Sequence, residues 1–298
     1  MLKTVADTHK AVEQFWNNRP CDSDRSGSAK GTKAYFDEIE RDRYAHQGHI
    51  LTDAVGRLDW NGKRVLEIGT GVGTDARKIV ERGARYTGIN IDQASVDMTA
   101  LALRLYGLPG TVEKHDATAL PYADASFDVV YSFGAFPCIP DLESALAEIH
   151  RVLRPGGDLV ALFYNRASIN YQVEIRVLRR LARPLLVVPG VVTVLNWLGL
   201  PKDRLVGHRE LYRAAPKMSA EEWLSRNTDG PDNPYICIHD AADVERLLRR
   251  FEIVRHTVHY FDYRHWGVIG ALMPKRLIDW LGSRWGWHRV VHARKARR

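Results

Sequence analysis

The stretch RVLEIGTGVGTDARKIVER, residues 64–82, contains three structural signals in succession. Arg64–Ile68 is a short apolar run, which predicts a buried strand. The turn that follows contains three glycines at alternate positions: Gly69, Gly71 and Gly73. Thr74–Arg82 then predicts a helix. This order is typical of α/β folds in which the backbone approaches a ligand and the free N–H groups at a helix start hold an anionic group.

The same alternation of short apolar runs and amphipathic helices continues along the chain. Further strands are expected at Arg85–Ile91, Thr111–Lys114, Phe127–Ser132 and Asp158–Tyr164, and helices at Gln93–Tyr106 and Asp141–Leu153. Arg154–Gly157 is expected to be a turn, and the closing strands are expected at Phe251–Tyr260 and His288–Ala293. Strands that alternate with helices predict an α/β fold with a doubly wound parallel sheet, buried on both faces.

The chain is expected to consist of four segments, one of which is this α/β pattern. They are an N-terminal helical arm (1–60), the α/β core (61–165), an inserted helical cap (166–243) and C-terminal strands that complete the sheet (244–298). The arm is expected to hold helices at 1–20, 32–48 and 50–58. Within the cap, Leu185–Leu200 is the most apolar stretch of the chain, but it is short for a membrane span and contains Pro189 and Gly190. We expect it to form a buried or interfacial cap helix.

Composition excludes several classes of protein. The 298 residues carry a formal net charge of +7, much of it in local runs, and no nucleic-acid-binding motif accompanies this charge. We therefore expect solvated basic faces and no nucleic-acid partner. The three cysteines form no CxxC pair, so no metal site is expected. The first residues contain no apolar signal segment, and a cytoplasmic location is expected.

The glycine spacing separates two classes of cofactor. The motif is GxGxG, whereas dinucleotide-binding folds use GxGxxG, and Glu67 stands two residues before the first glycine. With the stretches that follow, the chain resembles the class I S-adenosylmethionine-dependent methyltransferases, in the branch described as type 11. The matching stretches are VLEIGTGVGTD (65–75), TGINID (87–92), HDATALPYADASFDVVYSFGAF (115–136) and RVLRPGGDLV (151–160). The resemblance implies a Rossmann-like sheet of seven strands with a reversed C-terminal hairpin, and S-adenosylmethionine across the strand ends.

The resemblance also implies roles for the matching residues. Glu67 would orient the amino group of the cofactor, directly or through water. The turn around the methionine and ribose parts would consist of Gly69, Thr70, Gly71 and Gly73. Ser132, at the end of the fourth expected strand, completes this part of the expected cofactor site.

The adenosine end of the expected site departs from the family at one position. The family usually has an acidic residue where this chain has Asn90, which still offers one acceptor and one donor to the ribose hydroxyls. Asp92 either shares this work or forms the N-cap of the next helix. Asp116 matches the residue that receives the adenine amino group, with a backbone N–H of Ala117 beside it. Ile91 would pack on the adenine.

No residue stands out as a catalytic base. The run Phe133–Asp141 lacks the histidine that many relatives have there, and Cys138 or Pro137 occupies that region. The catalytic candidates are therefore weak ones in other parts of the chain. His208 is a candidate base, and the ring or hydroxyl oxygen of Tyr35 or Tyr44 could contact the sulfonium of the cofactor. The two tyrosines could instead simply pack the N-terminal arm onto the core.

The expected cap favours an apolar acceptor. It is rich in leucine, valine, tryptophan and tyrosine, which suits a small, largely apolar or aromatic molecule of the natural-product type, with O-, N- and C-methylation all open. The same side chains could be ordinary core or a face between copies of the chain. Two alternative functions remain: a membrane-peripheral lipid methyltransferase, suggested by the basic and apolar run 176–200, and a non-catalytic cofactor-binding scaffold.

Overall fold

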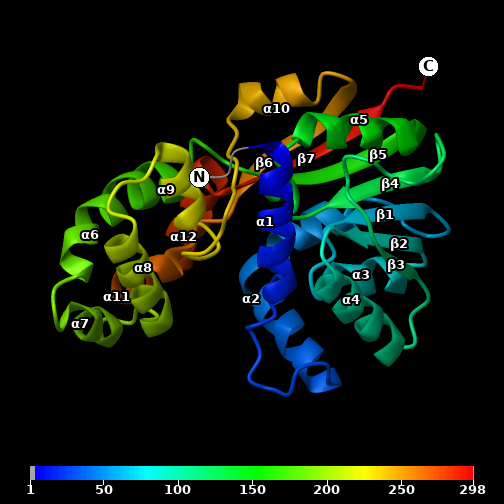
Figure 1. Ribbon diagram of the computed structural model, residues 1–298. Helices are drawn as coiled ribbons and strands as arrows, with labels where there is room; N and C mark the ends of the chain where they lie inside the picture. The colour runs from blue at the N-terminus through cyan, green and yellow to red at the C-terminus, as the bar shows by residue number, and fades with distance from the viewer. Residues whose placement is uncertain (1–3, 298) are drawn as a thin grey trace. The chain divides into compact units, whose positions relative to one another are not determined.

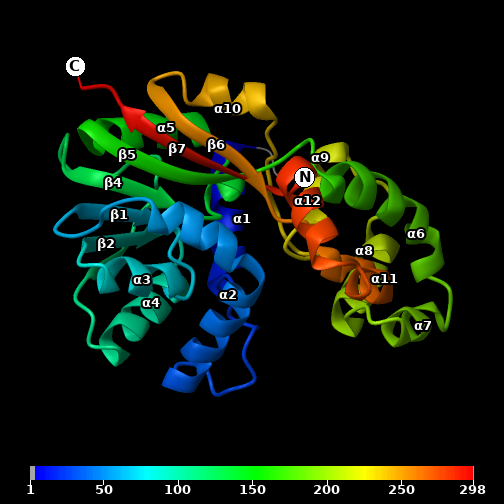
Figure 2. The ribbon, with the colours of Figure 1, turned by 180° about the vertical axis from the view of Figure 1, so that it is seen from behind.

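The computed structural model describes residues 4–297, which fold into two compact units (Figures 1 and 2). Unit 1 contains the chain up to Phe163, Ala241–His256 and the segment from Val290 onward. Unit 2 contains Tyr164–Asp240 and Thr257–Arg289. Residues 257–289, which the sequence places with the C-terminal strands, thus fold with the cap segment.

Unit 1 is organised by a seven-stranded sheet with the strand order β3-β2-β1-β4-β5-β7-β6. The strands are β1 (Arg64–Ile68), β2 (Arg85–Asn90), β3 (Thr111–Lys114), β4 (Phe127–Ser132), β5 (Leu153–Tyr164), β6 (Phe251–His259) and β7 (His288–Lys295). Strands β1 to β5 pair in parallel. The strand order changes direction between β1 and β4, which is the switch point where doubly wound sheets bind ligands. The predicted fold class is confirmed.

Helices cover both faces of this sheet, with α3 and α4 on one face and α5 and α10 on the other (Figure 1). The helices of unit 1 are α1 (Val5–Asn18), α2 (Lys33–Gly56), α3 (Thr74–Glu81), α4 (Gln93–Leu105), η1 (Phe136–Cys138), α5 (Leu142–Val152) and α10 (Ala241–Leu247). In α5, Leu142, Leu146 and Ile149 lie on one face and pack into the main core with Leu159 of β5. Helical periodicity of apolar residues therefore positions the helices against the sheet.

Helix α2 is longer than the sequence indicates. The expected break near Gly48 is absent, and one helix runs from Lys33 to Gly56. Ile50 and Leu51 are fully buried, so tertiary packing of the second half outweighs the low helix propensity of glycine. The prediction of two separate helices is wrong.

The expected turn at Arg154–Gly157 is part of β5. Phe127 of β4 pairs with Leu153, but the next paired residue, Val129, is opposite Asp158. The extra residues form a bulge, in which Gly156 takes a φ of 74° that favours glycine. The glycine pair therefore marks an irregularity within a strand.

Unit 2 is helical around an aromatic pair. Its helices are η2 (Asn170–Leu178), α6 (Arg179–Leu186), α7 (Val191–Trp197), α8 (Lys202–Ala214), α9 (Ala220–Arg226), η3 (Tyr263–Trp266), α11 (Gly267–Ala271) and α12 (Lys275–Trp285). The rings of Tyr212 and Trp223 stack with centroids 5.4 Å apart. The Trp223 Nε1–H donates to the Ile175 carbonyl (2.8 Å), and the Tyr212 hydroxyl donates to Asn227 Oδ1 (2.8 Å). These bonds join η2, α8 and α9.

The apolar stretch Leu185–Leu200 does not form one buried helix. It is divided between the end of α6 and α7, because Gly190 has a left-handed conformation at the N-cap of α7. Leu186 and Val192 are buried, but Trp197 is 84% exposed. The buried alternative is therefore wrong for most of these side chains, whereas the interfacial alternative stays a prediction. Within residues 4–297, no helix combines the length and the apolar character that crossing a bilayer requires.

Candidate functional site

A cavity lies in unit 1 at the carboxyl ends of the central parallel strands. Its walls come from the turn after β1, from the segments that follow β2, β3 and β4, and from helix α1. Six of the ten residues predicted to bind a cofactor line it: Gly69, Gly71, Asn90, Ile91, Asp116 and Ala117. The other four, Glu67, Thr70, Gly73 and Ser132, lie around it without forming its wall. Sequence segments far apart thus meet at the switch point of the sheet.

The turn after β1 presents backbone to the cavity. Gly69 has a φ of 84°, and a Cβ atom built on it would lie 2.4 Å from the Cβ of Ala135. A side chain at Gly69 would therefore clash with the segment that follows β4. The Thr70 hydroxyl accepts a hydrogen bond from Thr99 (3.0 Å), so this side chain holds the turn onto α4. Gly73 forms the left-handed N-cap of α3.

One amide side chain, Asn90, and one acidic side chain, Asp92, lie at the carboxyl end of β2 and line the cavity. The Asn90 Oδ1 accepts from the backbone N–H of Ile91 (2.9 Å). Asp92 is fully buried and is the N-cap of α4, because its Oδ1 accepts from the Ser95 N–H (2.8 Å). Its other oxygen, Oδ2, has no hydrogen-bond partner within residues 4–297. Burial raises the pKa of Asp92. The N-cap thus uses one carboxylate oxygen of Asp92, a residue that lines the cavity, and leaves the other without a partner among the described residues.

Glu67 and Ser132 stabilise the sheet beside the cavity. The Glu67 carboxyl group is 2% exposed and accepts a hydrogen bond from the Tyr86 hydroxyl (2.5 Å). Burial raises its pKa well above the usual range, and the nearby carboxyl of Asp75 adds to the shift. The Ser132 hydroxyl donates to the Ile68 carbonyl (3.0 Å). Their predicted cofactor contacts stay predictions.

None of the candidate catalytic residues lines the cavity. Tyr35 is fully buried and its hydroxyl donates to the Ser23 carbonyl (2.8 Å); burial raises its pKa to about 12. Burial also raises the pKa of Tyr44 to about 12. His208 belongs to unit 2, where its ring lies beside Tyr212, and burial lowers its pKa to about 4. A catalytic role for these three stays a prediction.

Helix α1 contributes residues that sequence reasoning missed. His9, Val12 and Trp16 line the cavity. The Nδ1 of His9 lies 3.1 Å from Asp116 Oδ2, while its Nε2 is buried and has no hydrogen-bond partner in the part of the chain that the structure describes. The spacing of Val12 and Trp16 indicates a buried helical face, but no local signal shows what that face covers.

A second set of polar contacts fixes α1 over the strand ends. Glu13 forms an ion pair with Lys114 at the end of β3 (2.5 Å), and Asn17 Oδ1 accepts from the Ala94 N–H at the start of α4 (3.1 Å). Together with His9, these residues recur at every fourth position and so lie on one face of the helix. Helix α1 therefore closes one side of the cavity.

The segment after β4 completes the wall without a histidine. Phe133 and the buried Cys138 line the cavity. The guanidinium of Arg43 lies over the Phe133 ring at 5.5 Å and pairs with Asp75 of α3 (2.7 Å). No cluster of three or more histidine, cysteine, aspartate or glutamate side chains suited to a metal occurs among the described residues. The site therefore consists of backbone, apolar and hydrogen-bonding groups.

Fold and site together resemble those of the class I methyltransferase domains, which use S-adenosylmethionine. Residues 66–161 match the family model of a methyltransferase domain, and the resemblance seen in the sequence is confirmed. Among solved structures, magnesium protoporphyrin IX methyltransferase (ChlM) of Synechocystis PCC 6803, with bound SAH, is similar at a TM-score of 0.54 and 14% identity. The match covers 97% of this chain and all of that one (100%). The [4+2]-cyclase SpnF is similar at a TM-score of 0.53 and 18% identity, over 98% of this chain and 95% of that one. These two similarities concern the fold alone.

Curated sequence relatives match part of the chain. Sterol 24-C-methyltransferase ERG6B of Gibberella zeae is 37% identical over 127 residues, which are 42% of this chain and 33% of that protein. Phthiotriol/phenolphthiotriol dimycocerosates methyltransferase of Mycobacterium tuberculosis is 41% identical over 103 residues (34% of this chain, 37% of that protein). Methyltransferase GfsG of Streptomyces halstedii is 36% identical over 123 residues (40% and 44%). The chain spans less than half the length of each of these relatives.

Proposed function

We propose that this protein transfers a methyl group from S-adenosylmethionine to a small, largely apolar acceptor. The observation that carries the proposal is the cavity at the switch point of the sheet, where the backbone of Gly69 and Gly71 faces the ligand space. The methyltransferase-domain match over residues 66–161 supports the same activity.

The residues on the cavity wall fit S-adenosylmethionine. The turn at Gly69 packs against Ala135 too closely for a Cβ atom, so main chain rather than a side chain lines the cavity there. Two buried polar atoms on the wall, Asp92 Oδ2 and His9 Nε2, have no hydrogen-bond partner within residues 4–297. Asp92 suits the ribose hydroxyls. It would accept the hydrogen bonds that relatives make with the acidic residue at the position of Asn90.

His9 and Asp116 would bind the adenine jointly. When the Nδ1–H of His9 donates to Asp116, its Nε2 would be a hydrogen-bond acceptor available to a ligand in the cavity that His9 lines. Such an acceptor matches the exocyclic amino group of adenine. Trp16 and Val12 of the same helix would exclude water from this end of the site.

The protein's part in the reaction is alignment. When bound, S-adenosylmethionine supplies a methyl group that its sulfonium already activates. The Gly69–Gly71 backbone and Asp92 fix the donor, and the apolar wall formed by Phe133 and Cys138 excludes water beside it. The cavity wall after β4 offers no histidine, and the histidines that line the cavity are His9 of α1 and His115 after β3.

An apolar acceptor agrees with two further observations. Two of the sequence relatives are named for sterols and for phthiotriol dimycocerosates. Unit 2 is rich in apolar and aromatic side chains, as acceptor-binding segments for such molecules are.

The test has two stages that separate binding from catalysis. Calorimetry with S-adenosylmethionine and S-adenosylhomocysteine measures cofactor binding. Methyl-labelled S-adenosylmethionine is then incubated with sterols, phenolic lipids and polyketides, and label is measured in the organic phase. We expect cofactor binding and labelling of at least one apolar class. Binding without any labelling would favour the scaffold alternative, and absence of binding would refute the proposal.

A further inference from the structure

Unit 2 carries almost all of the chain's net positive charge. It contains 16 lysine and arginine residues and 10 aspartate and glutamate residues, so it accounts for +6 of the total net charge of +7. It also contains 15 of the 18 large apolar side chains that are exposed among the described residues. Basic charge and exposed apolar surface on the same unit indicate an interaction surface, because isolated proteins rarely expose large apolar patches.

One part of this surface runs along η2 and α6. Val173, Val177, Leu181 and Leu185 recur at every fourth residue and are between 39% and 69% exposed. The opposite side of the same segment is buried: Ile175 accepts a hydrogen bond from the Trp223 indole, and Leu186 packs inward. The segment therefore has two apolar faces: one packs in the interior of unit 2, and the other faces solvent.

A second part joins the end of α7 to α11. The backbones touch here, since a Cβ atom on Gly267 would lie 2.7 Å from the Leu198 carbonyl oxygen. This contact brings Trp197, which is 84% exposed, next to the first turn of α11. Val268, Ile269 and Leu272 on that helix are 51%, 66% and 78% exposed. Figures 1 and 2 both show α7 and α11 at the same end of unit 2.

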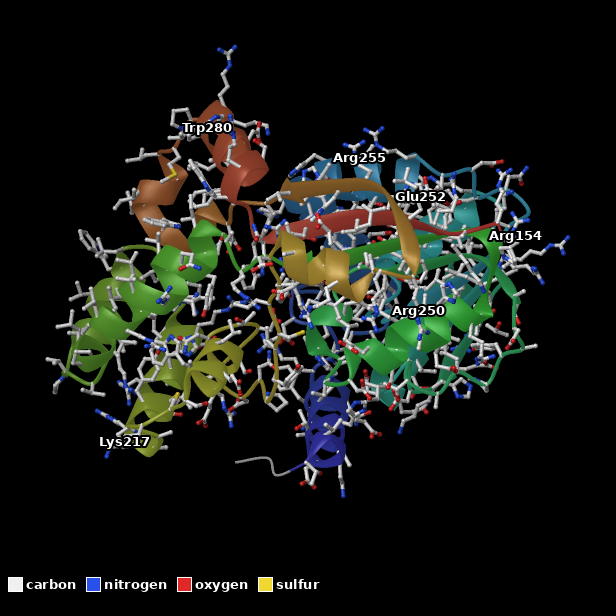
Figure 3. The ribbon with its side chains drawn as sticks, turned by 90° about the horizontal axis from the view of Figure 1, so that it is seen from above. Arg154, Lys217, Arg250, Glu252, Arg255 and Trp280 are labelled. Carbon is white, nitrogen blue, oxygen red and sulfur yellow. The ribbon has the colours of Figure 1, made fainter. Side chains whose placement is uncertain are left out.

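A short turn between α6 and α7 joins the two parts, and we name their exposed apolar side chains together the apolar band. Its residues are Val173, Val177, Leu181, Leu185, Val188, Val194, Trp197, Leu198, Val268, Ile269 and Leu272. Helix α12, beyond α11, adds Trp280, which is 49% exposed and lies at the outer edge of unit 2 in Figure 3. Exposed basic side chains flank the band, among them Arg176 on η2 and Lys202 on α8.

We propose that the apolar band docks unit 2 on the surface of an anionic lipid bilayer. Leucine, valine and isoleucine side chains would enter the boundary between headgroups and acyl chains, and tryptophan prefers that interface. The surrounding lysines and arginines would attract anionic headgroups. A nucleic acid fits less well, because its phosphates match the basic side chains but leave the apolar band facing water. Docking of this kind does not depend on methyl transfer.

Vesicle sedimentation of the full chain tests the proposal. The probes are vesicles of phosphatidylcholine alone and vesicles in which a third of the lipid is phosphatidylglycerol. We expect binding to the anionic vesicles at least about tenfold tighter than to the neutral ones, with a decrease at high salt because screening weakens surface attraction. Equal binding to both vesicles, or no binding to either, would overturn the proposal.

Paired variants locate the surface. Leu181→Glu with Trp197→Glu replaces exposed apolar side chains, so the fold is retained, and binding to anionic vesicles should weaken by about tenfold or more. Arg176→Glu with Lys202→Glu should weaken binding to anionic vesicles only. Leu105→Glu is the matched control, because Leu105 is 41% exposed but belongs to unit 1. It should bind like the unmodified protein.

The competing occupant is a second copy of this chain. Size-exclusion chromatography with light scattering, without lipid, distinguishes the two. A dimer that the Leu181→Glu and Trp197→Glu changes convert into a monomer would assign the band to self-association and overturn the bilayer proposal. A monomer in both cases, together with the vesicle result, would support it.

Discussion

At the scale of single residues, Gly69 is the position on which the proposed cofactor cradle depends most directly. Replacement by alanine should abolish cofactor binding, because the new methyl group would lie 2.4 Å from the Cβ of Ala135 and force the turn away from the segment after β4. Calorimetry with S-adenosylhomocysteine measures this loss.

Gly62→Ala is the matched control for the backbone cost. Gly62 also has a positive φ (69°), but a Cβ atom there meets nothing within 4 Å. Gly62→Ala should lose about 1–2 kcal/mol in the free energy of unfolding, since alanine is strained in this conformation. Gly69→Ala should lose more than this, because its methyl group also clashes with Ala135. Only Gly69→Ala should lose the cofactor; equal affinities in the two variants would contradict the role of the cradle.

His9 gives a second prediction at this scale. His9→Phe keeps an aromatic ring of similar size but removes the acceptor, and one lost hydrogen bond of about 1 kcal/mol corresponds to roughly fivefold weaker binding. Lys10→Ala, an exposed neighbour on the same helix, is the control.

An analogue distinguishes adenine recognition by His9 from general support of the site. S-Inosylhomocysteine carries a carbonyl where adenine carries its amino group. The unmodified protein should bind it less well than S-adenosylhomocysteine, and His9→Phe should reduce that preference. The same preference in both proteins would show that His9 does not contact the amino group.

At the scale of elements, Arg43 is the connection between α2 and the sheet. Its guanidinium pairs with Asp75 of α3 (2.7 Å) and with Asp22 of the preceding loop (2.9 Å), and the Tyr131 hydroxyl of β4 also donates to Asp75 (2.9 Å). Arg43→Met should lower the free energy of unfolding by about 3–5 kcal/mol, because the 4% exposed Asp75 would lose its cationic partner. Urea denaturation measures the loss.

Two further variants test whether this effect comes from the buried charge. Arg41→Met changes an exposed arginine of the same helix and should have little effect. Adding Asp75→Asn to Arg43→Met should restore part of the stability, since the uncompensated carboxylate is then removed. If Arg41→Met costs as much as Arg43→Met, the ion pair does not hold α2 in place.

At the scale of the whole molecule, unit 1 should lose stability in acid. Asp158 of β5 contacts His292 and Arg294 of β7 (2.8 and 2.9 Å). Burial raises the pKa of Asp158, but these two partners outweigh burial, so the pKa lies below its ordinary value of 3.8. A folded-state pKa below the unfolded one stabilises the protein fully above about pH 4 and loses that contribution as the pH falls.

Asp158→Asn should therefore unfold about 1.5–3 kcal/mol more easily at neutral pH and show a shallower loss of stability below pH 4. Thermal unfolding between pH 3 and pH 7 measures both effects, with the exposed Glu252 of β6 (Figure 3), changed to Gln, as the control. A parallel pH dependence in Asp158→Asn and the unmodified protein would show that this carboxylate does not govern acid unfolding.

Local patterns predicted most of the sheet. Strands β1 to β4 and helices α3 to α5 agree with the sequence to within about two residues, because short apolar runs, helical periodicity and glycines act over a few neighbouring positions. The errors came where distant packing outweighed local preference: Gly48 stays inside α2, and Arg154–Gly157 forms a bulge in β5.

The sequence by itself determined the parallel sheet, the glycine turn and the resemblance to methyltransferase domains, since these depend on residues that are neighbours along the chain. Only the tertiary structure decided that His9 meets Asp116, 107 residues further along, and that residues 257–289 fold with the cap. It also decided that the band around Trp197 faces solvent. Such contacts depend on which distant segment packs against a given helical face. The periodicity of apolar residues identifies that face but not the segment that covers it.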